Sequence, residues 1–358
     1  MNARTYRHPR KQVLFVCGSL NQTKMMHAVG RELEADYDTF YAPFYADGLV
    51  GALRSTGLFD FILEKTVMGG RFRQMTLDYL REHRLEIRER GEQIDPALVV
   101  TCSDVLVQRN IRPYPIVLVQ EGATNLETPL TRFARATGLP PWCGGGTTMA
   151  GESGLFDVFC VASEGYRDFF EKKGRGVPRE KMVVTGIPNF DDCEGYKRND
   201  FPHKNFVLIA TSDLRETQMS DDRIGFLKRC RDLAGGRQVI VKLHPNEEVD
   251  RAKREIASVF PEALVYTSGC AEEMVANCDM LLTQYSTLAF VGLALGKPVQ
   301  TYYDLEELKR LVPWQNGGRS AKHIGAVCRR VLEAAPEAPL RTPEFARPLT
   351  SDWSFETR

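Results

Sequence analysis

The chain has 358 residues, of which 43% are hydrophobic and 26% charged, so we expect a globular protein of two domains rather than a fibrous, disordered or disulfide-bonded chain. Lysine and arginine together number 47, as do aspartate and glutamate, and the formal net charge is therefore zero. A neutral chain lacks the broad basic field that draws proteins to nucleic acid, so we expect no nucleic-acid partner.

Neither a membrane span nor a secretion signal is visible in the sequence. No run approaches the ~20 apolar residues of a transmembrane helix, and the apolar stretch 13–17 is shorter than the core of a signal peptide. The nine cysteines are odd in number, scattered and without a CxxC pair, which argues against a zinc cluster or a dithiol redox site. Reduced thiols fit a cytoplasmic protein, and we expect that location.

Apolar runs that end in small or polar residues recur along the N-terminal half, at 12–19, 95–104, 115–122 and 156–164. A stretch with helical character, 23–33, follows the first of them. Because the runs are continuously apolar rather than alternating, they predict strands covered on both faces, as in a parallel sheet flanked by helices.

A second series of such runs occupies the C-terminal half, at 206–213, 237–245, 263–268, 279–286 and 297–304, with helices predicted at 222–233 and 248–259. This repeated strand–helix–strand order predicts two doubly wound α/β halves. The segment between the halves, 183–205, is rich in Gly, Pro and Asp and has no apolar period. We therefore predict one domain over 1–185, a second over 186–335 and a tail over 336–358.

Ligands of open α/β sheets bind beyond the carboxyl ends of the strands, so the residues that follow each predicted strand are the candidates for function. His244 and Pro245 stand at such an end. Because proline cannot continue the ladder, we expect the imidazole to reach the crevice and to donate to a phosphate oxygen or act as an acid or base. The alternative is a histidine satisfied by a neighbouring carbonyl.

Ser286 and Thr287 follow another strand and precede a predicted helix. Backbone N–H groups at a helix start, with adjacent hydroxyls, bind phosphate or pyrophosphate. An ordinary helix cap would have the same sequence, so the hydroxyls alone do not separate the two interpretations.

The N-terminal half has its own polar strand ends. Gln120 and Glu121 follow one strand, and Glu121 would serve as a general base or bind a sugar hydroxyl, unless it is only a solvated turn carboxylate. The turn that contains Gly18, Ser19 and Asn21 follows the first strand. It either admits an acceptor molecule or merely tightens the turn.

Several motifs are missing from the sequence. It has no GxGxxG after the first strand, which disfavours a nicotinamide cofactor, and no GxSxG, HExxH or DxD. The six histidines are dispersed. We therefore expect neither a metal site nor a cofactor.

The segments KLHPNE (242–247) and 278–308 together resemble the donor-binding half of GT-B glycosyltransferases. They are most similar to CDP-glycerol glycerophosphotransferase-like enzymes and Kdo transferases of bacterial capsule and wall polymer synthesis, and more loosely to UDP-GlcNAc 2-epimerases. The resemblance runs from a hinge at 186–189 to Leu308. It implies two Rossmann-like domains facing across a cleft, with the nucleotide and its phosphates held by His244, Pro245, Ser286 and Thr287.

The sequence also departs from these families. Gln284 and Val291 stand where the polyol-phosphate enzymes usually carry Asp, which argues against CDP-glycerol itself. The epimerases have Ser-Gly-Gly where this chain has Ser286, Thr287 and Leu288. The resemblance therefore favours transfer over epimerisation.

Transfer from a nucleotide donor needs a stabilised leaving phosphate, exclusion of water and deprotonation of an acceptor hydroxyl. Without a DxD motif the protein itself must supply the positive field, and the candidates are the helix start at 286–287, His244, Lys242 and Arg215. The base should come from the N-terminal half, with Glu121 as the first candidate and Asp104 as the second.

We therefore expect a transferase that moves a sugar or polyol phosphate from a nucleotide-sugar or CDP-polyol donor to a glycan or lipid-linked acceptor in bacterial envelope polysaccharide synthesis. One alternative is a non-hydrolysing UDP-GlcNAc 2-epimerase. The other is a protein that binds a nucleotide sugar without catalysis.

The segment 49–91 combines apolar and basic residues. Such a stretch would suit a peripheral contact with an anionic membrane that carries a lipid-linked acceptor. The alternative, which we favour, is a set of helices that pack their apolar sides on the sheet.

Overall fold

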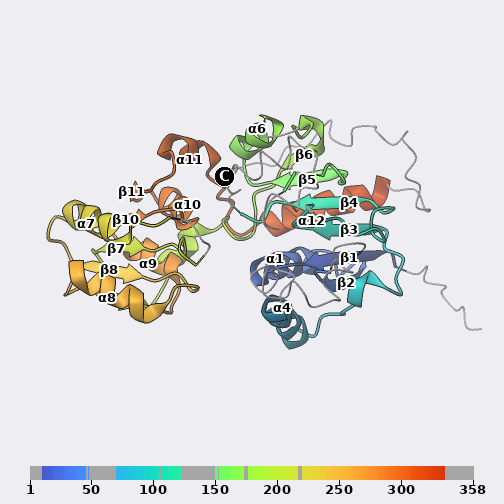
Figure 1. The fold of residues 1–358 in the computed structure, drawn as a ribbon. Helices are drawn as coiled ribbons and strands as arrows, with labels where there is room; N and C mark the ends of the chain where they lie inside the picture. The colour runs from blue at the N-terminus through green and yellow to red at the C-terminus, as the bar shows by residue number, and fades with distance from the viewer. Residues whose placement is uncertain are drawn as a thin grey trace, which may run out of the picture. The chain divides into compact units, whose positions relative to one another are not determined.

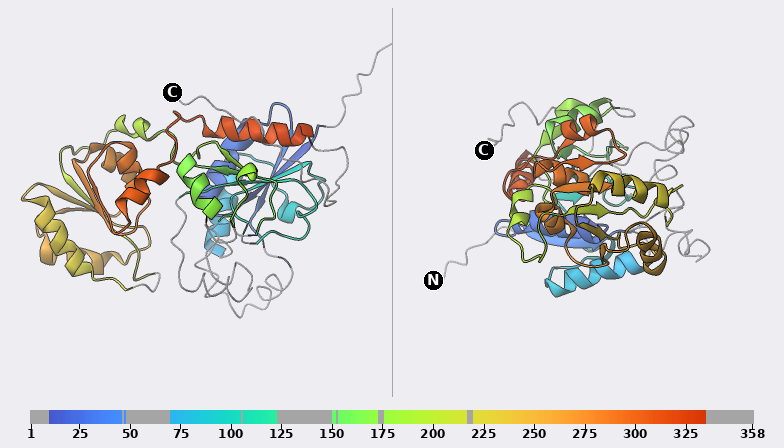
Figure 2. Two further views of the ribbon diagram at one scale, coloured as in Figure 1. Left: turned by 90° about the horizontal axis from the view of Figure 1, so that it is seen from above. Right: turned by 90° about the vertical axis from the view of Figure 1, so that its left-hand side faces the viewer.

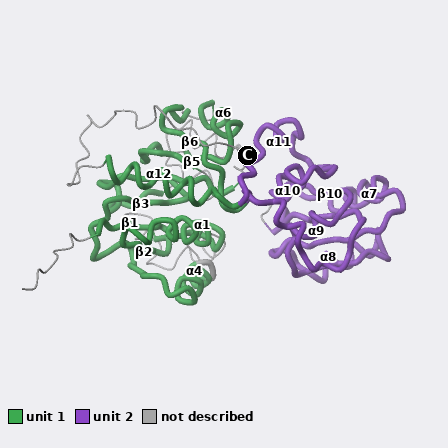
Figure 3. Tube along the Cα trace, turned by 180° about the vertical axis from the view of Figure 1, so that it is seen from behind, with its two compact units in different colours: residues 1–189, 318–358 green, residues 190–317 purple. Residues whose placement is uncertain are grey.

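The structure is a computed structural model that describes residues 10–334 apart from 46, 48–69, 105, 123–149, 152, 173–175 and 217–219. The chain divides into two compact units (Figure 3). The first comprises Met1–Asn189 and Gly318–Arg358, and the second comprises Phe190–Gly317.

The first unit is built on a parallel sheet in the order β2-β1-β3-β4-β5-β6 (Figure 1). Its strands are β1 (Gln12–Cys17), β2 (Asp38–Pro43), β3 (Leu98–Thr101), β4 (Ile116–Val119), β5 (Val158–Val161) and β6 (Met182–Val184). The described helices are α1 (Leu20–Arg31), α4 (Gly70–Glu82), α6 (Glu164–Lys172) and α12 (Ser320–Ala334), with 3-10 turns at Glu89–Gly91 and Arg179–Lys181.

The second unit contains a parallel sheet in the order β11-β10-β7-β8-β9. Its strands are β7 (Val207–Ala210), β8 (Val239–Lys242), β9 (Leu264–Tyr266), β10 (Met280–Thr283) and β11 (Val299–Gln300). The helices are α7 (Arg223–Ala234), α8 (Val249–Val259), α9 (Ala271–Asn277), α10 (Leu288–Ala294) and α11 (Leu305–Leu311), with a 3-10 turn at Cys193–Lys197.

The predicted α/β fold class, with a parallel sheet in each half, is confirmed. Each apolar run named above contains a strand, and the central residues of β1, β3, β4, β5, β7 and β8 are buried on both faces of their sheets. Helix ends follow the expected local chemistry. The Asp222 carboxylate accepts from the Gly225 N–H at the start of α7, and Gly235 ends that helix in the left-handed region with φ 58°.

The C-terminal helix belongs to the first unit, whereas the predicted second domain ran to residue 335. In Figure 2 helix α12 (red) lies along the sheet of the first unit, which the chain re-enters after the second unit. Gly325 lets α12 approach α1 closely, because a Cβ there would lie 2.9 Å from the Cβ of Glu32. Two further contacts join the helix to the start of the chain: Arg329 donates to the Glu32 carbonyl, and Lys11 donates to the Leu332 carbonyl at 2.6 Å.

Of the basic apolar segment 49–91, residues 49–69 lie outside the described residues. Helix α4 buries Thr76 and Leu80 completely. The Thr76 hydroxyl donates to the Gly18 carbonyl at 2.9 Å. Helix α4 therefore packs its buried side against the rest of the first unit, as the favoured alternative predicted for this part of the segment. Among the described helices none is long and apolar enough to cross a membrane.

Candidate functional site

Each sheet has a point where its strand order reverses, and ligands of open α/β sheets bind there, outside the carboxyl ends of the strands. In the first sheet, β2 lies on one side of β1 and β3 on the other, so the reversal falls between β1 and β3. In the second, β8 and β9 extend from one side of β7, and β10 and β11 from the other. The reversal therefore falls between β7 and β10.

Three sequence-predicted residues of the first unit lie at its reversal point. Val16 pairs with Thr101, and Thr101 pairs with Leu118, so these residues form one row across β1, β3 and β4. Three residues further along each segment stand Ser19, Asp104 and Glu121. All three therefore follow the carboxyl edge of the same sheet at a matching distance.

Glu121 is held by two neutral donors. The Ser19 hydroxyl donates to Oε1 at 2.9 Å, and the Gln22 amide donates to Oε2 at 2.5 Å. Burial raises the pKa of Glu121 above its ordinary value, and the hydrogen bonds from Gln22 and Ser19 offset part of that rise. Among the described residues no cation pairs with this carboxyl, and a carboxyl with a raised pKa and no cationic partner is suited to accepting and returning a proton.

The start of helix α1 fixes Gln22. Ser19 and Gln22 form a capping box, in which the Gln22 N–H donates to the Ser19 hydroxyl at 3.2 Å and the Ser19 N–H donates to Gln22 Oε1 at 3.1 Å. The Gln22 side-chain amide is thus held at its oxygen by the Ser19 N–H and at its nitrogen by the Glu121 carboxyl. Gly18 leaves room for this arrangement, because a Cβ at this position would lie 1.7 Å from Gln22 Oε1 and would displace the amide. The sequence carries this signal as a Ser followed three residues later by Gln, and our sequence analysis missed it.

The other candidates of the first unit have different surroundings. Asp104 is fully buried, and its Oδ2 accepts from the Ser153 N–H at 2.8 Å and from the Ser153 hydroxyl at 3.0 Å. Gln120 links two strand ends, since its Oε1 accepts from the Ala162 N–H at 2.9 Å and its Nε2 donates to the Gly122 carbonyl. Asn21 is exposed on α1, and no contact joins it to Glu121.

His244 follows β8 in the second unit, with 37% of its side chain exposed. Its Nδ1 accepts from the Asn246 N–H at 3.3 Å and lies 3.6 Å from an oxygen of Asp213. In the neutral ring an accepting Nδ1 leaves the proton on Nε2, which is then available to a ligand. The adjacent Pro245 is exposed.

The two predicted cationic residues near His244 already have partners. Arg215 makes a two-pronged ion pair with Glu255, with both N–O distances at 2.7 Å. Lys242 is buried and donates to the Leu243 carbonyl at 2.9 Å, and burial lowers the pKa of its amine. Arg215 is thus neutralised by a carboxylate, and the Lys242 amine is held against the backbone of its own strand end.

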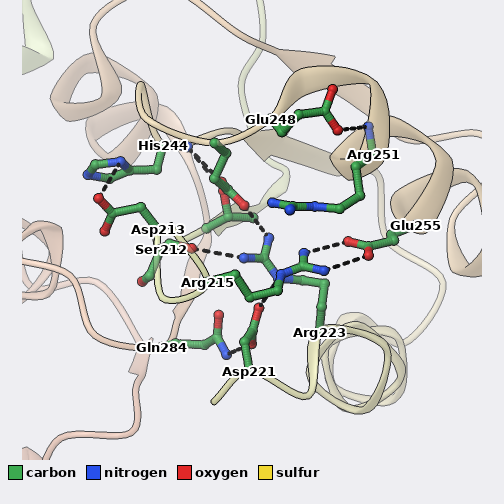
Figure 4. Close-up of polar contacts among 12 residues, drawn as sticks. Ser212, Asp213, Arg215, Asp221, Arg223, His244, Glu248, Arg251, Glu255 and Gln284 are labelled. Atoms are coloured by element: carbon green, nitrogen blue, oxygen red, sulfur yellow. Dashed lines mark hydrogen bonds and ion pairs between the residues drawn. The ribbon is translucent and has the colours of Figure 1, made fainter. Parts of the chain in front are cut away.

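A buried arginine that the sequence analysis did not single out organises this edge (Figure 4). Arg223 contacts Asp221 at 3.0 Å and Glu247 at 2.7 Å, and it donates to the Ser212 carbonyl at 2.8 Å. All three charged side chains are almost fully buried. A cation at a helix start opposes the helix dipole, and that mismatch at the first residue of α7 was the available sequence signal.

Ser286 and Thr287 precede α10, as predicted. The Ser286 hydroxyl accepts from the Leu288 N–H at 3.3 Å, which is the local bond of an ordinary cap, whereas the Thr287 side chain makes no capping bond. No group of three or more His, Cys, Asp and Glu side chains in the described part of the chain is arranged to hold a metal ion.

No protein-family model matches the sequence, and neither does any curated protein. Solved structures with a similar fold do exist. A putative UDP-N-acetylglucosamine 2-epimerase from Listeria monocytogenes is similar over 92% of this chain and 99% of its own, with 12% identity and a TM-score of 0.55. The UDP-GlcNAc 2-epimerase from Neisseria meningitidis bound to UDP-GlcNAc is similar over 89% and 100%, with 13% identity and a TM-score of 0.52.

A variant of the wall teichoic acid polymerase TagF is similar over 91% of this chain and 90% of its own, with 12% identity and a TM-score of 0.50. The chain has the GT-B fold. The expected resemblance to epimerases and to wall-polymer enzymes is therefore confirmed at the level of the fold, and it extends over both units.

Proposed function

We propose that the chain is an enzyme that transfers a sugar or a polyol phosphate from a nucleotide-activated donor to a glycan or lipid-linked acceptor of the bacterial envelope. The observation that carries the proposal is the Glu121 carboxyl, partly buried at the carboxyl edge of the first sheet and held by Ser19 and Gln22 rather than by a cation. Such a group is suited to take the proton of an acceptor hydroxyl.

The chemistry would proceed as a displacement. Glu121 removes the acceptor's proton as the acceptor oxygen bonds to the transferred group, and the bond from that group to the nucleotide's phosphate oxygen breaks. The leaving phosphate gains negative charge and needs a hydrogen-bond donor. Within the second unit, the Nε2–H of His244 would donate to a phosphate of the bound nucleotide. Because Arg215 and Lys242 are already engaged, His244 is the favoured donor to that phosphate.

The similar structures support a nucleotide-linked substrate. One of them is described as bound to UDP-GlcNAc, and another is named as a polymerase of wall teichoic acid. Both have the same fold as this chain. From them we infer the class of donor and a role in the bacterial envelope, and not a particular sugar.

The first test is a thermal-shift screen of the wild type and of His244→Ala against CMP, CDP, UMP, UDP, GDP and ADP. A ligand at about 100 times its Kd stabilises the native state by ~2.7 kcal/mol, which is readily measured. We expect one nucleotide to stabilise the wild type and to lose most of that effect in the variant. A screen in which no nucleotide stabilises either protein would refute the proposal.

One observation favours a second candidate, a sugar-nucleotide 2-epimerase. Asp104, which is buried, stands at the end of β3 beside the strand that carries Glu121, and an epimerase needs groups that remove and return a proton. An epimerase would convert its sugar nucleotide with no acceptor present, whereas a transferase would not. A nucleotide sugar that binds and is not turned over with any acceptor would indicate a binding protein.

A further inference from the structure

Gln284 lies at the reversal point of the second sheet, directly after β10 and beside the end of β7. The backbone there is fixed, since the Gln284 carbonyl accepts from the Thr301 hydroxyl at 2.7 Å and from the Tyr302 N–H at 3.1 Å. The residue is 1% exposed. A buried polar side chain therefore stands at the place where ligands bind to open α/β sheets.

The orientation of the Gln284 amide is determined by its neighbour. Its Nε2 donates to Asp221 Oδ1 at 2.7 Å, and Asp221 is ion-paired to Arg223. Because a carboxylate only accepts, the amide nitrogen must face Asp221 and the oxygen must point the other way. In Figure 4 the oxygen is turned from Asp221 toward Ser212.

The amide oxygen has no hydrogen-bond partner, although it is buried. A buried acceptor left unsatisfied costs free energy, and native structures seldom contain one without a reason. The missing partner must donate a hydrogen bond. A phosphate is a poor candidate because it brings only acceptor oxygens, and because the Asp221 carboxylate lies against the same amide.

A group of aromatic side chains begins at the next residue along the chain. Tyr285 is 37% exposed and Tyr302 is 41% exposed. The Tyr285 ring makes edge-to-face contacts with the rings of Tyr302 and Tyr303, with centroid distances of 5.5 and 5.2 Å. Its backbone is tied to Ser212, whose hydroxyl donates to the Tyr285 carbonyl at 3.2 Å. Rigid, partly exposed aromatic rings of this kind stack well on flat heteroaromatic ligands.

We propose that Gln284 and Tyr285 form a nucleobase subsite, in which Gln284 Oε1 accepts a ring N–H or an exocyclic amino N–H and Tyr285 stacks on the base. A nucleobase supplies both features that the site calls for, a flat ring and a hydrogen-bond donor at its edge. The inference rests on the proposed function, because it assigns the base of the nucleotide-activated donor. Gln284 is then a residue that determines which bases are accepted.

The test is a double-mutant cycle between the protein and the ligand, measured by isothermal titration with the nucleotide that binds in the screen. Each analogue lacks one donor group: the N3-methyl base for a uridine nucleotide, the N4-dimethyl base for a cytidine nucleotide, the N6-dimethyl base for an adenosine nucleotide and hypoxanthine for guanine. The 2′-deoxy and 3′-deoxy forms are measured separately. The protein variants are Gln284→Met, which keeps the length of the side chain and removes the acceptor, and Gln108→Met as a matched control. Gln108 is an equally buried glutamine of the first unit that donates to the Tyr45 carbonyl.

We expect the base-modified analogue to bind the wild type and Gln108→Met about tenfold more weakly than the parent nucleotide. Gln284→Met should bind both ligands with equal affinity. A variant that still discriminates, or coupling only with the deoxy analogues, would overturn the nucleobase subsite and leave the proposed function standing. If no nucleotide binds the wild type, the proposed function itself fails.

Tyr285 provides a second readout that does not depend on the folding of Gln284→Met. Base stacking on an aromatic side chain contributes ~1–3 kcal/mol, so Tyr285→Ala should weaken nucleotide binding roughly 5- to 150-fold. Tyr285→Phe keeps the ring and should bind as the wild type does. Equal binding by all three proteins would show that the ring does not stack on the ligand and would overturn that part of the proposal.

Discussion

The carboxyl edges of the two sheets carry carboxylates in opposite electrostatic settings. At the first edge Glu121 is partly buried, and among the described residues its carboxyl meets only neutral donors. Desolvation therefore raises the pKa of this carboxyl, with no cation to offset the rise. At the second edge Asp221 and Glu247 share Arg223, and Glu255 pairs with Arg215, whose hydrogen bond lowers the pKa of Glu255. A carboxyl without a cationic partner can exchange a proton. Carboxylates that are ion-paired to arginine instead fix the positions of the side chains around them. The comparison fits the proposed function, in which the first unit takes the acceptor's proton and the second binds the nucleotide.

Removing the unpaired carboxyl should have the largest effect. In Glu121→Gln the side chain keeps its size and loses the ability to accept a proton, so we expect the transfer rate to fall 10²- to 10⁴-fold, roughly the contribution of a general base. Nucleotide binding, measured by thermal shift, should be unchanged. Glu89→Gln is a matched control, because Glu89 belongs to an exposed ion pair of the same unit. An active Glu121→Gln enzyme would end the assignment of proton transfer to this edge.

Removing Arg223, which pairs with Asp221 and Glu247, should instead lower the stability of the second unit. Arg223→Met leaves the carboxylates of Asp221 and Glu247 buried without a cation, and such losses cost about 3–5 kcal/mol. Urea unfolding would measure the change in the free energy of unfolding. The control is Arg179→Met, since Arg179 pairs with three carboxylates at the surface, and exposed pairs contribute at most about 1 kcal/mol. Equal losses in the two variants would contradict the buried network.

A smaller effect should follow when one of the two neutral donors to Glu121 is removed. The Gln22 hydrogen bond lowers the pKa of Glu121, so Gln22→Met should raise that pKa further and shift the acid limb of the pH–rate profile to higher pH. We expect about a tenfold loss of rate on the acid limb that recovers as the pH rises, because a single hydrogen bond to a charged group contributes ~1.5 kcal/mol or more. Lys24→Ala, an exposed change on the same helix, should leave the profile in place. A uniform loss at all pH values would mean that Gln22 serves only the fold.

The strands and the strand ends could be predicted from the sequence because each depends on a short stretch of chain. A continuously apolar run specifies a buried strand wherever it falls, and the residue after it must reach the sheet's edge. His244 and Glu121 were found in this way. Their partners could not be found, because Gln22 meets Glu121 across 99 positions of the chain and Asp213, which follows β7, lies beside His244, which follows β8.

The return of α12 to the first unit was also beyond the sequence pattern. The helix follows the second sheet along the chain, and its amphipathic pattern does not say which sheet it covers. Only the close approach at Gly325 and the contacts to Glu32 and Lys11 decide this. Local periodicity thus specifies the elements, while the assignment of an element to a unit depends on contacts between distant residues.

The least disruptive test compares how stability depends on pH in Glu121→Gln and Glu255→Gln. The folded-state pKa of Glu121 is raised, so the stability of the wild type falls as the pH rises from the unfolded pKa through the folded one, and Glu121→Gln should be the more stable protein at pH 7. The folded-state pKa of Glu255 is lowered, so its contribution is present above the unfolded pKa and disappears as the pH falls through the folded one. Glu255→Gln should therefore be less stable at pH 7, by under about 1 kcal/mol because the pair is partly exposed.

Both differences should vanish at low pH, where the wild-type carboxyls are protonated. Two substitutions of the same chemistry would then change the free energy of unfolding in opposite directions, and a common sign at pH 7 would remove the electrostatic distinction between the two edges.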